Sequence, residues 1–290
     1  MQSPELLIGL NLFDGDAGAI KRQAAACEAL AALDGIEIVN VQFERGHRRE
    51  VPGITTLAQL VADSTGVTGS SGRRKPIALE MFDVLAAAAD ARRCRYFAYI
   101  NSDIVVTPAL VQAVRKAGKE TYAVSRSDVG EGESGRMVTA GQDMFVVSVE
   151  WWRGNRARFR PYILGEACWD NVYTAVMMCH SDGALLNRDA LLLHERHAAV
   201  WRDATPGARY NGYLAALDAR YFDLWSRYWH RLEQLRRAGA PPEAEADLAR
   251  DTFVWKRSAP DAVRQFIRGA RARLRYHRLR TELLTAATAG

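Results

Sequence analysis

Long hydrophobic runs are absent from this 290-residue sequence, and none approaches the roughly 18 residues that a membrane-spanning helix needs. The first ten residues, MQSPELLIGL, lack a basic start and a long apolar stretch, so we expect no secretory signal. Cysteine is scarce, and Cys27, Cys94, Cys168 and Cys179 form no CxxC motif. We therefore predict a cytoplasmic protein whose thiols are reduced and mostly buried.

Excess positive charge is absent from most of the chain. The net charge is +5, but residues 256–280 alone carry nine Lys or Arg and one Asp, a local charge of +8. The remainder therefore carries about −3. Such a body offers no basic surface to a phosphate backbone, so we expect nucleic acid not to be the main ligand.

The sequence does contain a regular alternation of strand and helix patterns. Its composition, 48% hydrophobic and 25% charged, is typical of a globular protein. Apolar periodicity predicts strands at 6–14, 35–44, 121–128 and 143–152, and a further strand that starts at residue 97. It predicts helices at 17–33, 76–93 and 108–118. Residues 45–74 interrupt this order as a long surface segment, with a short helix expected around 55–62. The alternation predicts an α/β fold, a largely parallel sheet flanked by helices.

Polar residues stand where the predicted strands end. In doubly wound sheets, ligands bind beyond the carboxyl ends of the strands, and six polar residues fall there: Asn11, Asp14, Asn101, Asp103, Arg126 and Asp128. Asn101 and Asp103 are two residues apart, so their oxygens can converge on one hard divalent cation such as Mg²⁺ or Mn²⁺. The alternative is that Asn-Ser-Asp closes a turn or caps the next helix.

Four segments in this order, YINSDIVV, GQDMFVV, LGEACWDN and LLLHERH, resemble nucleotide-sugar-dependent glycosyltransferases of the GT-A fold. The resemblance covers about residues 6–201, and RRKPIALEMFDVL ahead of the predicted strand also fits. It implies a metal motif, called DxD, after the fourth strand, and a GT-A-like (Rossmann-like) catalytic domain over residues 1–205. This chain has Asn101 in place of the first Asp, which removes one anionic ligand.

The resemblance implies a donor site for a UDP- or GDP-sugar held through Mn²⁺ or Mg²⁺. Asp103 would bind the metal that bridges the diphosphate, and His194 and His197 of HERH would complete the metal sphere. Asn101 would contact the ribose or an outer-shell water, and Ser102 would belong to the same donor site. Neutral imidazoles suit a borderline ion such as Mn²⁺. The alternative for the histidines is one buried and one surface residue without a ligand.

Further donor contacts are implied for residues from several segments: Asn11, Phe13 and Asp14 for the base and ribose, Arg73 and Lys75 for the leaving diphosphate, Arg126 and Asp128 for the donor, and Asp143 for the donor sugar or acceptor. Several of these residues have a plain alternative. Loop arginines are usually only solvated, Arg126 and Asp128 can pair with each other, and Asp143 can belong to a turn before a strand.

LGEACWDN is the candidate acceptor segment. An inverting transferase needs a carboxylate to deprotonate the acceptor hydroxyl, and Glu166 or Asp170, four residues apart, would supply it. We favour Asp170, with Trp169 as an apolar wall for a sugar ring. The alternative is that the acids only decorate a helix N-terminus, where the macrodipole favours them. A retaining mechanism also stays open.

Helical patterns dominate residues 206–290, which we predict to be a helical extension. Apolar spacing marks helices at 212–235 and 260–280. In the second, an arginine stripe flanks an apolar face, which predicts peripheral contact with the inner face of the membrane, where a lipid-linked acceptor could reside. The alternative, which we prefer, is that this face packs on the domain or on a twin subunit in a homo-oligomer.

Two other functions compete with sugar transfer to a glycan, a lipid-linked acceptor or another hydroxyl. A sugar-1-phosphate nucleotidyltransferase shares the sheet type but would need a Gly-rich basic loop after the first strand, and NLFDGDAGAIKR is only a loose version. A sugar-nucleotide-binding protein with little turnover is the third hypothesis, because Asn101 weakens the metal motif.

Overall fold

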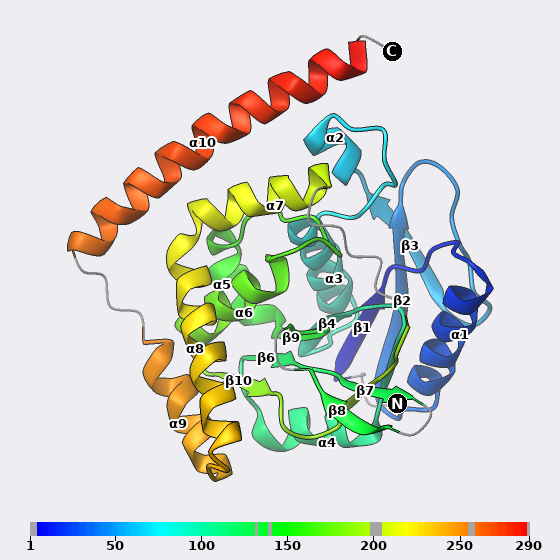
Figure 1. The fold of residues 1–290 in the computed structure, drawn as a ribbon. Helices are drawn as coiled ribbons and strands as arrows, with labels where there is room; N and C mark the ends of the chain where they lie inside the picture. The colour runs from blue at the N-terminus through cyan, green and yellow to red at the C-terminus, as the bar shows by residue number, and fades with distance from the viewer. Residues whose placement is uncertain (1–4, 131–132, 139–140, 198–204, 255–258, 289–290) are drawn as a thin grey trace. The chain divides into compact units, whose positions relative to one another are not determined.

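The computed structural model describes residues 5–130, 133–138, 141–197, 205–254 and 259–288 (Figure 1). The chain forms two compact units, each built from separate segments. The first contains residues 1–61, 80–157 and 181–199, and the second contains residues 62–79, 158–180 and 200–290. The predicted division of the chain at residue 205 stays a prediction.

A seven-stranded sheet forms the centre of the first unit. Its strand order is β10 (Gly183–Leu186), β6 (Thr121–Val124), β9 (Met144–Ser148), β4 (Tyr96–Ile100), β1 (Leu6–Leu10), β2 (Ile36–Phe43) and β3 (Thr55–Leu60). All neighbouring pairs are parallel except those of β9, which runs antiparallel to both β4 and β6. The carboxyl ends of β1, β4 and β6 therefore lie along one edge of the sheet.

The central strands are apolar on both sides because helices cover both faces of the sheet. Leu6, Ile8 and Leu10 pack in one cluster with residues of α1 (Ala17–Ala31) and α4 (Pro108–Ala117). On the opposite face, Phe82 of α3 (Ala78–Ala91) packs against Phe97, and both contact Trp152 of α5 (Val149–Asn155). This mostly parallel sheet flanked by helices confirms the predicted fold class.

A second sheet of four strands belongs to the same unit. Its order is β5 (Ile104–Val106), β11 (Leu192–Glu195), β7 (Ser127–Gly130) and β8 (Glu133–Met137). It collects the segments that leave the central sheet after β4 and β6, because β5 follows β4 and β7 follows β6 within a few residues. This small sheet brings the residues after those two strands next to β11.

Helices dominate the second unit. It contains α2 (Ser64–Thr68) and α6 (Trp169–His180). A 3₁₀ turn at Arg156–Arg158 leads into the segment of this unit that starts at residue 158. The C-terminal helices are α7 (Pro206–Leu217), α8 (Ala219–Arg237), α9 (Pro242–Thr252) and α10 (Ala259–Thr288), so the predicted helical extension is confirmed. Buried Asn211 of α7 holds the segment before α6, exchanging hydrogen bonds with the backbone of Ile163 and donating to Ala167 O.

Some predicted elements differ from the observed ones. The short helix expected at 55–62 is wrong, since Thr55–Leu60 forms β3; its β-branched threonines suit the free edge that β2 offers. The strand expected at 143–152 stops at Ser148, whose hydroxyl caps α5. The helix expected at 212–235 is two helices, α7 and α8, that meet at Asp218, whose carboxylate accepts from Arg160 and Tyr162.

Among the residues that the structure describes, we find no helix with both the length and the hydropathy to cross a bilayer.

Candidate metal and donor site

The turn between β4 and β5 carries Asn101, Ser102 and Asp103. Buried β4 ends at Ile100, and the chain turns where the amide nitrogen of Ile104 donates to Asn101 O. Ser102 is buried in this turn, while Asp103 keeps about a third of its side chain exposed (31%). The turn therefore presents one carboxylate at the carboxyl edge of the sheet.

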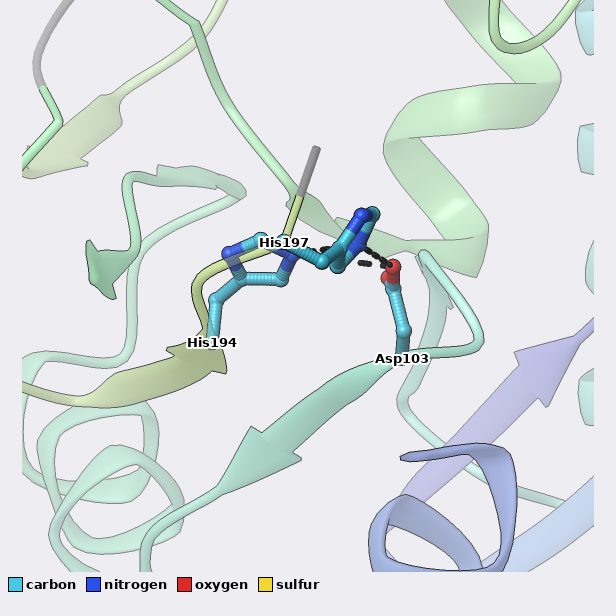
Figure 2. Close-up of side chains that lie close together, drawn as sticks. All are labelled: Asp103, His194 and His197. Atoms are coloured by element: carbon cyan, nitrogen blue, oxygen red, sulfur yellow. Dashed lines mark hydrogen bonds and ion pairs between the residues drawn. The ribbon is translucent and has the colours of Figure 1, made fainter. Parts of the chain in front are cut away.

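Two histidines face that carboxylate. One lies in β11, and the other follows just after this strand. His194 ends the pairing of β11 with β5 opposite Ile104, and His197 follows three residues later. Figure 2 shows both imidazoles pointing toward Asp103. His197 Nε2 lies 3.3 Å from Asp103 Oδ2, and His194 Nε2 lies 3.6 Å from the same oxygen and 3.3 Å from His197 Nε2.

The three converging atoms fit a shared divalent ion. One oxygen and two nitrogens lie within 4.8 Å of one another. Ligand atoms that sit about 2.1 Å from a common ion are about 3–3.5 Å apart, which matches the observed spacings. A carboxylate with two imidazoles is also a donor set that suits Mn²⁺ and similar ions. Asp103, His194 and His197 are thus the residues here that could hold a metal.

Asp128 fixes the orientation of His194. Asp128 Oδ1 lies 2.9 Å from His194 Nδ1, and β7 and β11 are paired at these two residues. An ionised carboxylate can only accept, so Nδ1 of the imidazole carries a proton and Nε2 faces Asp103. Nε2 donates to Asp103 when the ring is protonated, and offers its lone pair to an ion when the ring is neutral. This carboxylate–histidine pair is the usual outer support of a metal-binding imidazole.

A buried polar chain continues behind Asp128. The Arg126 guanidinium donates through Nε to Asp128 Oδ1 at 2.9 Å and through Nη1 to Asp143 Oδ1 at 2.8 Å. The same Asp143 oxygen accepts from Asn101 Nδ2 at 2.9 Å, and Asn101 N donates to Asp143 O. Arg126 thus connects the support of His194 to the turn that carries Asp103.

The electrostatics of this cluster favour charged partners. Burial raises the pKa of Asp103, but hydrogen bonds from His194 and His197 outweigh it and lower the pKa to about 2. Burial lowers the pKa of His194, yet Asp103 and Asp128 together raise it above its usual value. Arg126 and His194 likewise overcome burial and lower the pKa of Asp128. Both carboxylates are therefore ionised at neutral pH.

Asn11, Phe13 and Asp14 follow β1 at the same edge of the sheet. Asn11 Nδ2 donates to Val41 O at 2.7 Å, and the backbone of Phe13 exchanges two hydrogen bonds with the buried Gln23 side chain. Asp14 is more than half exposed (57%) and lies 2.7 Å from His47 Nε2, with Arg49 Nη1 3.5 Å away. Sequence reasoning missed His47 and Arg49, since RGHRRE has no periodicity that ties it to β1.

In the second unit, Glu166 is buried, and both of its oxygens have donors. Lys75 Nζ lies 2.6 Å from Glu166 Oε1, and Thr205 Oγ1 donates to Oε2 at 2.9 Å. Lys75 Nζ also donates to Gly165 O at 3.3 Å. Arg73 is exposed, and its backbone carbonyl accepts from Ser64 Oγ. Thr205 is the N-cap of α7, and the Thr-Pro pair at 205–206 could have predicted the start of this helix.

Asp170 lies in the first turn of α6 and is half-buried. Cys168, just before the helix, has a φ of 75°, which is strained for a residue other than glycine. Burial first, and then the Asp170 charge, raises the pKa of its thiol to about 11. Trp169 does not offer the expected sugar-stacking wall, because it is 4% exposed and packs edge-on against Tyr173.

Comparison with known proteins identifies the fold. No protein-family model matches the sequence, and no curated protein matches it. Residues 1–349 of TarS from S. aureus, in complex with UDP-GlcNAc, match 74% of this chain with a TM-score of 0.51 and 9% identity. The chain has a glycosyltransferase fold. It spans 65% of that TarS chain, so the match concerns the fold alone.

A second solved structure is more distant. The mannosyltransferase PcManGT from Pyrobaculum calidifontis, in complex with GDP-Man and Mn²⁺, has a TM-score of 0.42 and 15% identity, covering 99% of this chain and 87% of that chain. The glycosyltransferase fold confirms what the four sequence segments predicted about architecture.

Within the glycosyltransferase fold, the candidate residues fall into separate groups. The first unit brings together Asp103, His194 and His197, and behind them Asn101, Arg126, Asp128 and Asp143. Arg126 and Asp128 do pair, as the sequence alternative held. Tyr99 donates its hydroxyl to Asn101 Oδ1 at 3.2 Å. Sequence reasoning did not include it among the site residues, because it belongs to a buried strand.

Proposed function

We propose that the protein transfers a sugar from a nucleotide-sugar donor to a hydroxyl acceptor. The observation that carries this proposal is the convergence of Asp103, His194 and His197 at the carboxyl edge of a glycosyltransferase-fold sheet. That edge is where such sheets bind their ligands. The three ligand atoms and their spacing fit a divalent ion of the kind that holds a diphosphate.

The residues of the first unit have distinct roles in this proposal. Asp103, His194 and His197 hold Mn²⁺ or Mg²⁺, and Asp128 and Arg126 keep His194 in the orientation that binding needs. When bound, the ion would neutralise negative charge on the departing nucleoside diphosphate. Asn101 lacks the charge of an aspartate and has its amide committed to Asp143, so its oxygen, which accepts from Tyr99, is the group left for a donor ribose or a water.

Asp170 is the residue we assign as the base that removes the acceptor's proton. Glu166 fits that role less well, because Lys75 and Thr205 occupy its two oxygens and hold it in a buried ion pair. The strained backbone at Cys168 lies between the two acids, and strain of this kind clusters at functional segments. A carboxylate base makes the reaction an inverting one.

Other finer parts of the proposal concern the donor and the acceptor. Asn11, Phe13 and Asp14 would contact the base and ribose of a UDP- or GDP-sugar, with His47 and Arg49 beside Asp14. Arg73 and Lys75 would meet the diphosphate, and a hexose or pentose would pass to a glycan or a lipid-linked hydroxyl. An acceptor on a lipid would place the protein peripherally at the inner face of the membrane.

The test is a panel of nucleotide sugars incubated with the protein and Mn²⁺, with release of nucleoside diphosphate as the readout. We expect slow hydrolysis of one donor without acceptor, and loss of this release in Asp103→Asn. The matched control is Asp34→Asn, which makes the same change at an exposed position before β2, at the opposite edge of the sheet.

Three outcomes would contradict the proposal or one of its parts. Release of nucleoside triphosphate that requires pyrophosphate would identify a nucleotidyltransferase instead. A thermal shift with a nucleotide sugar, but no product after prolonged incubation with any acceptor, would identify a binding protein. Equal activity of Asp103→Asn and Asp34→Asn would remove the metal role from Asp103.

A further inference from the structure

Helix α10 packs on the second unit through one narrow face. Tyr276 stacks on Tyr213 of α7 with ring centroids 4.4 Å apart, and its hydroxyl donates to Val67 O at 3.2 Å. Ala272 is buried on the same face, and a Cβ added at Gly269 would lie 3.5 Å from Leu217. Small residues at 269 and 272 let the helix approach α7 closely.

The larger apolar residues of α10 lie on a different face and are exposed. Val263 is 59% exposed, Phe266 77%, Ile267 46% and Leu274 72%. Their spacing of three and four residues places them in one stripe along the helix. The preferred expectation that the apolar face packs on the domain is therefore wrong for these four residues. We call this set the exposed stripe.

Arginines border the exposed stripe. Five of them, at positions three or four apart, form a row beside it: Arg264, Arg268, Arg271, Arg275 and Arg278. All five are exposed, and Arg268 also pairs with Asp223 of α8. Arg273 and Arg280 are exposed as well, and by the same helical spacing they fall on the other side of the stripe. From residue 262 to residue 281 the sequence contains no acidic residue.

We propose that the exposed stripe of α10 binds the surface of an anionic lipid bilayer. An amphipathic helix of this type buries its apolar face at the headgroup boundary, while the flanking arginines contact lipid phosphates. Charge complementarity selects this occupant over a second copy of the chain, because pairing two such helices would bring their arginine rows together. The proposal rests on the stripe and not on transferase activity, so either can fail alone.

The test compares vesicles of neutral phosphatidylcholine with vesicles that also contain phosphatidylglycerol, in co-sedimentation with the full chain. One variant, Phe266→Glu with Leu274→Glu, removes apolar contacts. Its matched control is Val61→Glu, which makes the same kind of change at a residue that is 68% exposed and outside α10. These side chains are exposed, so unchanged thermal midpoints should verify that both variants fold.

A second variant tests the charge. Arg264→Gln with Arg271→Gln and Arg275→Gln removes three charges from α10. Its control replaces three exposed arginines of α8 in the same way: Arg227, Arg231 and Arg237. We expect the wild type to sediment only with phosphatidylglycerol vesicles and to be released by high salt. Both α10 variants should bind at least about tenfold more weakly, while both controls bind like the wild type.

Three results would overturn the proposal. The wild type could stay in the supernatant with both kinds of vesicle, or the α10 variants could bind as tightly as their controls. Light scattering could also show a dimer that Phe266→Glu with Leu274→Glu converts to a monomer, without any vesicle binding by the wild type. That last result would assign the exposed stripe to a second copy of the chain.

Discussion

At the residue scale, Asp128 determines which nitrogen of His194 faces Asp103. Its carboxylate accepts from Nδ1 at 2.9 Å and leaves the lone pair of Nε2 for an ion. Arg126 in turn holds Asp128 through Nε and reaches Asp143 through Nη1. One guanidinium therefore holds two carboxylates, one in β7 and one just before β9, and its effect on metal binding passes through Asp128 rather than through contact with the ion.

We predict that Asp128→Asn weakens Mn²⁺ binding about 10- to 100-fold. An asparagine can present its NH₂ group to Nδ1, which would move the imidazole proton to Nε2 and block the lone pair. Electron paramagnetic resonance of free Mn²⁺ measures the affinity without any turnover. Asp34→Asn is the control, and its affinity should equal that of the wild type. Unchanged affinity in Asp128→Asn would contradict the role we give to this carboxylate.

Glu166 and Asp170 should respond differently to the same kind of substitution. Glu166→Gln leaves the Lys75 ammonium without its carboxylate, so we expect a loss of about 1–3 kcal/mol in the free energy of unfolding. Asp170→Asn should keep that stability and lower the turnover rate about 10²- to 10⁴-fold, because the acceptor loses its base. Denaturant titration and initial rates measure the two effects. The reverse pattern would make Glu166 the base.

How far the site could be predicted depends on the range of its contacts. Asp103 and the two histidines were predictable, because each stands at the end of an apolar strand pattern or in HERH. The pairing of Arg126 with Asp143 joins residues 17 positions apart, and the contact between Lys75 and Glu166 joins residues 91 positions apart. Local patterns carry no signal for such partners, so their roles as supports were visible only in the structure.

At the element scale, the N-terminus of α7 surrounds Glu166 closely. A Cβ added at Gly207 would lie 2.8 Å from Glu166 Cδ and Oε1, whereas one added at Gly212 would meet nothing within 4 Å. Both glycines lie in the same helix. Gly207 therefore leaves space for the buried carboxylate, and Gly212 has no packing reason to lack a side chain.

We predict opposite effects of alanine at these two positions. Gly212→Ala should raise the free energy of unfolding by about 0.5–1 kcal/mol, because alanine is the better helix former. Gly207→Ala should lower it by about 1–3 kcal/mol, because Glu166 must move from Lys75 and Thr205. Urea titration of both variants measures the difference. Equal stabilisation by both alanines would mean that Glu166 is not held where the structure places it.

Element boundaries followed the sequence where local signals were strong. α1 begins at Ala17, where Asp16 caps it, and α4 begins at Pro108, and both starts agree with the predicted helices at 17–33 and 108–118. Residues 121–128 gave one apolar pattern but form two strands in two sheets, β6 and β7. The split depends on β11, which pairs with β7 from more than 60 residues away, so tertiary pairing overrides the local pattern.

At the scale of the whole molecule, the alternation of strands and helices was sufficient to predict the parallel sheet. It could not predict β9, which enters antiparallel between β4 and β6. Nor could it predict that residues 62–79 and 158–180 join the helices after residue 205 in one compact unit. The periodicity of a helix indicates that one face is apolar, but it does not indicate what covers that face. Helix α10 is an example, because its large apolar residues are exposed.

The pH dependence of stability is a property of the whole chain to which two histidines contribute with opposite sign. Burial first, and then the Arg158 charge, lowers the pKa of His180, whose Nε2 lies 2.8 Å from the Tyr221 hydroxyl. The unfolded chain therefore binds the proton first as pH falls below about 6.5. The contribution of His180 is present above that pH and is lost on acidification. His194, with a raised pKa, contributes below its unfolded pKa and loses that contribution as pH rises.

We predict that His180→Gln flattens the acid side of the stability profile. The variant cannot take up a proton at this position, so the difference in free energy of unfolding between wild type and variant should shrink as the pH falls from 7 toward 5. One proton corresponds to a slope of at most about 1.4 kcal/mol per pH unit. Urea titrations at a series of pH values measure it, with His230→Gln, at an exposed position of α8, as the control. A difference that stays constant or grows on acidification would mean that folding does not lower the pKa of His180.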